Sequence, residues 1–202
     1  MVIKDSKPVV AQYGQWDGYP SGQGVTILNF LKTHDMAILA KQLEKVRFAN
    51  DEDNKKKEEF FKSIGCKDGW MNGDQAVLYH KEYPYASRDI GGEILEMIYN
   101  STDEEIVLVD SSNFANDSLF CEWGYVVNLD TMQLEVYKGF ISEQPETPDT
   151  RFGNVKSDSE EKYYPIQPCG IFDIDRLPEE ADFVEACDPP EPEEGEEEVP
   201  ES

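Results

Sequence analysis

Residues 119–140 read LFCEWGYVVNLDTMQLEVYKGF. Between residues 119 and 129, bulky apolar side chains occupy every second position, which is the period of a strand with one buried face. Residues 130–132 supply a turn, and the alternation resumes at Leu134. The stretch therefore predicts a β-hairpin within an antiparallel sheet.

Shorter strand patterns and helical stripes surround this hairpin. Strands are expected over residues 2–3, 9–13, 105–109 and 165–174. Apolar residues three and four apart predict helices over residues 25–31, 36–46, 51–64 and 74–82, and over a further segment with Ser87 as its N-cap. Together these elements predict one α+β domain over residues 1–176, with an antiparallel sheet and its hairpins packed against several helices.

The charge of the chain is strongly negative. It has 18 Lys and Arg residues against 43 Asp and Glu residues, a formal net charge of -25. This balance argues against direct binding of nucleic acid or of an anionic membrane, since both need clustered cations. Residues 177–202 contain twelve acidic residues, no Lys or Arg, and several prolines, so we expect an acidic, disordered tail.

Two further features concern compartment and metals. The chain shows no signal-peptide pattern and no apolar run near the roughly 20 residues that span a bilayer, which predicts a cytoplasmic protein. The cysteines are scattered and lack Cys-x-x-Cys spacing, and only His34 and His80 offer imidazoles. No metal site is therefore predicted, and no cofactor is indicated.

The segment from Gln12 to Gly24 is the strongest candidate site. It combines polar and aromatic side chains with glycines and ends where a helix is expected to begin, so unpaired N–H groups there could hold an anion or a carbonyl oxygen. It matches neither a phosphate loop nor the Gly-x-Gly-x-x-Gly fingerprint. The ligand-binding candidates are Gln12, Tyr13, Gln15, Trp16, Asp17, Tyr19, Gly22, Gly24 and Glu122.

Two alternatives stay open for these residues. The rings of Trp16 and Tyr19 could fill the core while the glycines only make turns. Glu122 could be solvated, or it could join Asp17 and Asp110 in a carboxylate cluster suited to a hard cation or to acid–base chemistry.

Residues 11–24, AQYGQWDGYPSGQG, followed by VTILNFL, resemble a family of uncharacterised bacteriophage and prophage proteins. Residues 119–130 and 134–139 resemble the same family. The resemblance implies a phage-encoded protein of the host cytoplasm. More distant proteins with a Tyr-x-x-x-Asp-x-Tyr-Pro-x-Gly-x-Gly pattern carry a small-Thr-Arg segment just before the first strand. If that segment holds a nucleophile or a ligand contact, as an N-terminal nucleophile hydrolase would require, the resemblance implies an enzyme of that kind.

These observations support three functional hypotheses. The first is a phage accessory protein that binds a host protein or a small metabolite, with a counter-defence role as an acidic nucleic-acid mimic or by ligand sequestration. The second is a hydrolase or transferase with its site at the 12–24 loop, using Asp17 and Glu122. The third is a nucleotide-binding module at the helix start after Gly24.

Overall fold

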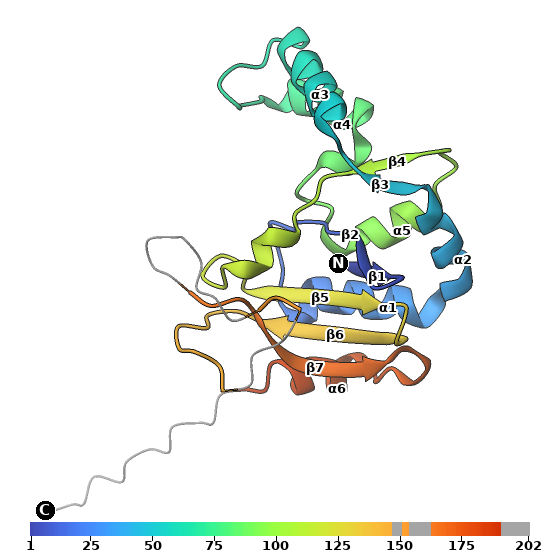
Figure 1. Cartoon of the computed structure of the whole chain (residues 1–202), viewed down its shortest axis with the longest axis vertical. Coiled ribbons are helices and arrows are strands. Elements are labelled where there is room, and N and C mark those ends of the chain that lie inside the picture. The colour runs from blue at the N-terminus through green and yellow to red at the C-terminus, as the bar shows by residue number, and fades with distance from the viewer. Residues whose placement is uncertain (147–150, 154–162, 191–202) are drawn as a thin grey trace, which may run out of the picture.

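The computed structural model describes residues 1–146, 151–153 and 163–190. Its main sheet has five strands in the order β2-β1-β5-β6-β7 (Figure 1). The strands are β1 (Val2–Lys4), β2 (Lys7–Val10), β5 (Trp123–Asn128), β6 (Gln133–Lys138) and β7 (Gln167–Asp173). Neighbouring strands run antiparallel except β1 and β5, which are parallel. The predicted α+β class with a mostly antiparallel sheet is confirmed.

The predicted hairpin is the β5–β6 pair. Tyr125 pairs with Val136 and Val127 with Leu134, which keeps the alternating side chains in register. Strand β5 is shorter than the alternation predicts because residues 117–121 fold into a turn. In this turn the Cys121 N–H donates to the Asp117 carbonyl at 3.0 Å. Strand pairing therefore starts at Trp123.

Helices cover one face of this sheet. They are α1 (Val25–Thr33), α2 (Met36–Gln42), α5 (Ile94–Tyr99) and α6 (Glu180–Cys187). Leu28, Leu39 and Ile98 from these helices are fully buried in the same core as Leu134 and Val136 of the sheet. The opposite face is covered by loops, which contribute Ala115, Cys121 and Ile166 to a smaller core with Ile3, Val126 and Tyr137.

A helical arm projects from the end of the molecule farthest from β7 (Figure 1). It consists of α3 (Asp51–Ser63) and α4 (Gly73–Glu82), which begin at capping boxes on Asn50 and Asn72. Neither helix contains a fully buried residue; the two meet through aromatic rings such as Phe61 and Tyr79, whose centroids are 6.0 Å apart. Gly65 ends the first of them with a φ of 83°.

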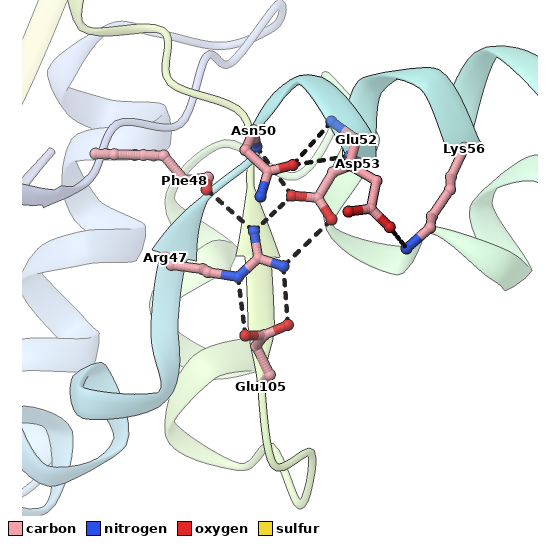
Figure 2. A network of polar contacts seen from close by, with 7 residues as sticks. All are labelled: Arg47, Phe48, Asn50, Glu52, Asp53, Lys56 and Glu105. Carbon is pink, nitrogen blue, oxygen red and sulfur yellow. Dashed lines mark hydrogen bonds and ion pairs between the residues drawn. The ribbon is translucent and has the colours of Figure 1, made fainter.

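A polar network anchors the arm to the body (Figure 2). A second sheet of two parallel strands, β3 (Val46–Phe48) and β4 (Ile106–Leu108), lies at its base. The Arg47 guanidinium donates to both carboxylate oxygens of Glu105, at 2.8 and 2.9 Å, and to those of Asp53, at 2.5 and 3.2 Å. Asp53 also accepts from the Asn50 N–H. Arg47 of β3 thus joins Glu105, the residue before β4, to the first turn of α3.

Three expectations are corrected. Val46 belongs to β3 and not to a helix, because the helix ends in a 3₁₀ turn at Leu43–Lys45. Ser87 is not an N-cap: its hydroxyl accepts from Asp89 N–H, and α5 starts only after the 3₁₀ turn Gly91–Glu93. Positive φ at Gly91 prevents an earlier helix start.

The third correction concerns the acidic tail, which we expected to begin at residue 177. Residues 180–187 form α6, and its Phe183 and Cys187 are 0% and 2% exposed. Burial of this apolar pair, four residues apart, outweighs the acidic composition. Residues 191–202 of the expected tail lie outside the described residues.

Candidate functional site

A cavity of about 140 Å³ lies beside the start of β1 and the adjoining strand β5. Their parallel pairing is short, joining Val2 to Val127 and Ile3 to Asn128. Beyond it, Met1 donates from its amino group to the Tyr125 carbonyl at 2.7 Å, and the space beside this contact remains open. The cavity therefore lies next to the parallel pair at the centre of the sheet.

Five segments supply most of the cavity wall. They are the start of β1, the stretch from the end of β2 through the 12–24 loop, the Gly91–Gly92 turn into α5, the loop after β4, and the segment from Cys121 into β5. Ile27 of α1, Phe152 and Ile166 complete the wall. Ser111 N–H donates to the Ala11 carbonyl at 3.0 Å and joins two of these segments. The side chains around the space are mostly apolar or aromatic, with a few uncharged polar groups.

Four hydrogen bonds hold the 12–24 loop against the cavity. The Tyr125 hydroxyl donates to the Gly18 carbonyl at 2.8 Å. The Gln23 side chain donates to the Trp16 carbonyl at 3.3 Å and accepts from Gly92 N–H at 2.6 Å. Gln12 donates to the Ser87 carbonyl at 3.0 Å. The loop is thus fixed to two other segments of the wall.

Two glycine contacts explain why this loop is so rich in glycine. A Cβ on Gly14 would lie 3.1 Å from the Cα of Gly91, so the two backbones touch directly. A Cβ on Gly22 would lie 2.3 Å from the Asp17 carbonyl oxygen. Both positions need the absence of a side chain for close packing.

The predicted site residues fall into two groups. Gln12 and Tyr13 line the cavity, and the Tyr13 ring packs edge-on against Phe114, with centroids 4.7 Å apart. Trp16 and Tyr19 lie outside it and are 60% and 47% exposed. Their rings therefore do not fill the core.

The predicted carboxylates also lie outside the cavity wall. Asp17 has a φ of 54° and accepts from the Tyr19 hydroxyl at 3.0 Å, a hydrogen bond that raises the pKa of Tyr19. Glu122 is exposed and precedes β5, and Asp110 is exposed and accepts from Ser112 N–H. Among the described residues, these three do not meet around the cavity.

Gln15, Gly22 and Gly24 have structural contacts. Gln15 N–H donates to the Arg88 carbonyl at 2.9 Å. Gly22 and Gly24 belong to the π-helical turn Pro20–Gly24 that leads into α1, where Gly24 is buried. None of the three lines the cavity.

The backbone N–H groups that we expected to be free at the start of α1 form hydrogen bonds within the Pro20–Gly24 turn. The N–H groups of Gly22 and Gly24 donate to the Tyr19 carbonyl, and that of Gln23 donates to the Asp17 carbonyl. The Val25 N–H is taken by carbonyls of the turn itself. These groups are therefore not available to an anion.

Sequence reasoning missed several wall residues. Gly91 and Gly92 are not among the predicted site residues, although a glycine pair permits close backbone approach. Ser111 and Ser112 follow a buried strand, a position where small polar residues often mark a site. Tyr125 carries no sequence signal that separates it from its alternating neighbours.

The ionisable groups at the cavity favour their neutral forms. Burial lowers the pKa of the Met1 amino group to about 6 and raises the pKa of the Cys121 thiol to about 12. Burial also raises the pKa of Tyr125. No described residue with a charged side chain lines the cavity. At neutral pH the wall is therefore close to uncharged.

The described residues lack two kinds of feature. No group of three or more His, Cys, Asp and Glu side chains in this part of the chain is placed to hold a metal ion. In the same residues, no helix combines the length and the apolar character needed to cross a bilayer.

Comparison with known proteins yields no relative: no family model, no curated protein and no solved structure matches this chain.

Proposed function

We propose that this chain binds a small, uncharged, mainly apolar molecule in the cavity between β1, β5 and the 12–24 loop. This is the small-metabolite form of the first hypothesis. The observation that carries it is the mainly apolar cavity of about 140 Å³ with a few polar groups in its wall. Ligand pockets typically combine these two features.

The volume limits the size of the ligand. An engineered apolar cavity of about 150 Å³ holds one benzene molecule. The cavity here is of similar size, so we expect a ligand of about one ring with few substituents.

The wall also suggests how a ligand is oriented. Tyr13 and Phe114 present aromatic surfaces, which favour stacking or edge-on contact with a ring. Gln12, Ser111 and Ser112 bring amide and hydroxyl groups that suit one or two hydrogen bonds. A ring with a hydroxyl, carbonyl or amide substituent fits this combination.

The other hypotheses receive less support from the geometry. Hydrolysis by Asp17 and Glu122 would require carboxylates that meet in a pocket, and neither lines the cavity. A nucleotide would need cations or free N–H groups for its phosphates, and the N–H groups before α1 are already paired. Sequestration of a ligand by a phage accessory protein is compatible with the site we propose.

Ligand screening with a cavity-blocking variant tests the proposal. Gly18 lines the cavity, and a Cβ on it would meet nothing within 4 Å, so Gly18→Leu adds bulk at the wall without a backbone clash. Gly73→Leu is the matched control, since Gly73 has equally open surroundings on the arm. Single-ring compounds are added to each protein, and melting temperature and ligand-detected NMR are recorded.

We expect some single-ring compounds to raise the melting temperature of the wild type and of Gly73→Leu, and to lose this effect in Gly18→Leu. If no compound binds, or if all three proteins bind equally well, the cavity is not the binding site.

A further inference from the structure

We propose that Cys169 and Cys187 form an oxidisable thiol pair, which closes to a disulfide in response to a peroxide and fastens α6 to β7. This modification site is separate from the cavity and does not depend on the proposed ligand. It rests on the placement of two sulfur atoms by a β-bulge and by a helix end.

The bulge directs Cys169 toward the helix. Val136 of β6 pairs with Gly170, and Tyr137 pairs with Pro168, so Cys169 is the extra residue between two ladder pairs. A bulge re-aims side chains relative to a regular strand. Cys169 accordingly packs against the helix-covered core, while its thiol lies 3.5 Å from the Val136 carbonyl.

Cys187 approaches the bulge in β7 from helix α6. It is the last residue of α6 and is 2% exposed. Its sulfur would lie 3.3 Å from a Cβ on Gly170, the neighbour of Cys169. Cys187 belongs to the helix-covered core and Cys169 packs against the same core, so both thiols lie on one side of β7 beside Gly170.

The surroundings divide the chemical roles between the two thiols. The hydrogen bond from Cys187 and the nearby Lys138 ammonium lower the pKa of Cys169. The same hydrogen bond and burial raise the pKa of Cys187. Cys169 is also the less buried of the two, which makes it the thiol that meets an oxidant first.

The reaction with hydrogen peroxide balances in two steps. The Cys169 thiolate attacks one peroxide oxygen, the O–O bond breaks, hydroxide leaves, and Cys169 becomes a sulfenic acid. The Cys187 sulfur then attacks the Cys169 sulfur, an S–S bond forms, the S–O bond breaks, and the hydroxyl leaves as water with the thiol proton. In sum, two thiols and one peroxide give one disulfide and two waters.

The disulfide would secure an element that covers much of the core. Phe183 of α6 is fully buried, and its ring lies 5.2 Å from that of Phe172 in β7. A Cβ on Gly24 would lie 3.0 Å from the Phe183 ring, so α6 also packs on the turn that leads into α1. A covalent link at Cys187 therefore holds a helix that contacts both the sheet and the candidate loop.

Peptide mapping of the oxidised wild type tests the proposal directly. The reduced full-length chain is treated with hydrogen peroxide, free thiols are alkylated under denaturing conditions, and disulfides are located by mass spectrometry. We expect one intramolecular bond between Cys169 and Cys187, a mass lower by two hydrogens, a higher melting temperature, and Cys66 and Cys121 recovered as free thiols. Reduction with dithiothreitol should reverse all of these changes.

Variants and thiol kinetics give independent readouts. Cys169→Ser and Cys187→Ser should each abolish the bond, and Cys66→Ser, which alters another buried cysteine, should retain it. In the native wild type at pH 7, iodoacetamide should modify Cys169 about tenfold faster than the other three cysteines. The proposal is overturned if the wild-type map shows Cys169 as a sulfinic acid without a bond to Cys187, or linked to another cysteine or another chain.

Discussion

Gly22 shows how a single residue shapes the candidate loop. A methyl group there would meet the Asp17 carbonyl oxygen at 2.3 Å, and the backbone could not move away without breaking the Gly22 N–H bond to Tyr19. We expect Gly22→Ala to lower the free energy of unfolding by about 1–3 kcal/mol in urea titrations. Gly18→Ala, with open space around its Cβ, is the control and should change stability little.

The Tyr125 hydroxyl is a second single group that holds the candidate loop in place. Its hydroxyl is the direct link from β5 to the 12–24 loop, through the Gly18 carbonyl. Tyr125→Phe removes this hydrogen bond and keeps the ring, so we expect a loss of about 1 kcal/mol in unfolding free energy. Hydrogen exchange should become faster in the 12–24 loop and stay unchanged in the arm; equal protection in both proteins would contradict this role.

At the scale of elements, the Arg47 network predicts a pH dependence. The Arg47 hydrogen bonds, and then the Asn50 N–H, lower the pKa of Asp53 from 3.8 to about 2. A lowered carboxyl pKa stabilises the folded state above the unfolded value, and this contribution is lost as pH falls from about 4 through 2. Asp53→Asn should therefore destabilise the protein at pH 6 and matter progressively less toward pH 2.

Urea titrations at a series of pH values measure this difference. Asp51→Asn is the matched control, because Asp51 is exposed on the same helical turn. A stability difference between wild type and Asp53→Asn that stays constant from pH 6 to pH 2 would show that the Asp53 charge does not stabilise the arm.

Helix α6 gives a further prediction at this scale. Because Phe183 is fully buried between α6 and the sheet, Phe183→Ala should lower the free energy of unfolding by about 3–5 kcal/mol. Glu185→Ala, on the exposed side of the same helix, should be nearly neutral. Thermal and urea melts of both variants decide whether α6 belongs to the cooperative core.

The elements differ in how far the sequence predicts them. The β5–β6 hairpin and α1, α2, α3 and α4 follow local periodicity and are found close to the predicted positions. β3 was missed because three residues carry too little pattern and its partner β4 lies far along the chain. α6 was missed because the acidic composition of residues 177–202 outweighed the signal of one apolar pair, Phe183 and Cys187.

For the whole molecule, the net charge of -25 predicts a response to salt. Mutual repulsion among the acidic groups opposes compaction, and added salt screens it. We expect the melting temperature to rise as sodium chloride is increased from about 10 to 200 mM, where the Debye length shortens from roughly 30 to below 10 Å. A melting temperature that falls over this range would show that attractive ion pairs dominate instead.

The candidate site is also a property of the whole molecule. The sequence pointed to the 12–24 loop, and Gln12 and Tyr13 do line the cavity. The remaining wall comes from segments that only the packed fold brings together, and Trp16 and Asp17 point elsewhere in spite of their local prominence. Long-range packing of this kind leaves no periodic trace in the sequence.

The place of β1 in the sheet has a consequence for synthesis on the ribosome. Val2 emerges early, yet its parallel partner is Val127, so the β1–β2 hairpin must wait for the second half of the chain before its open edge is covered. An unpaired apolar edge is a site of self-association during this delay. We therefore expect the inner edge of β1 to stay open until β5 has left the ribosome.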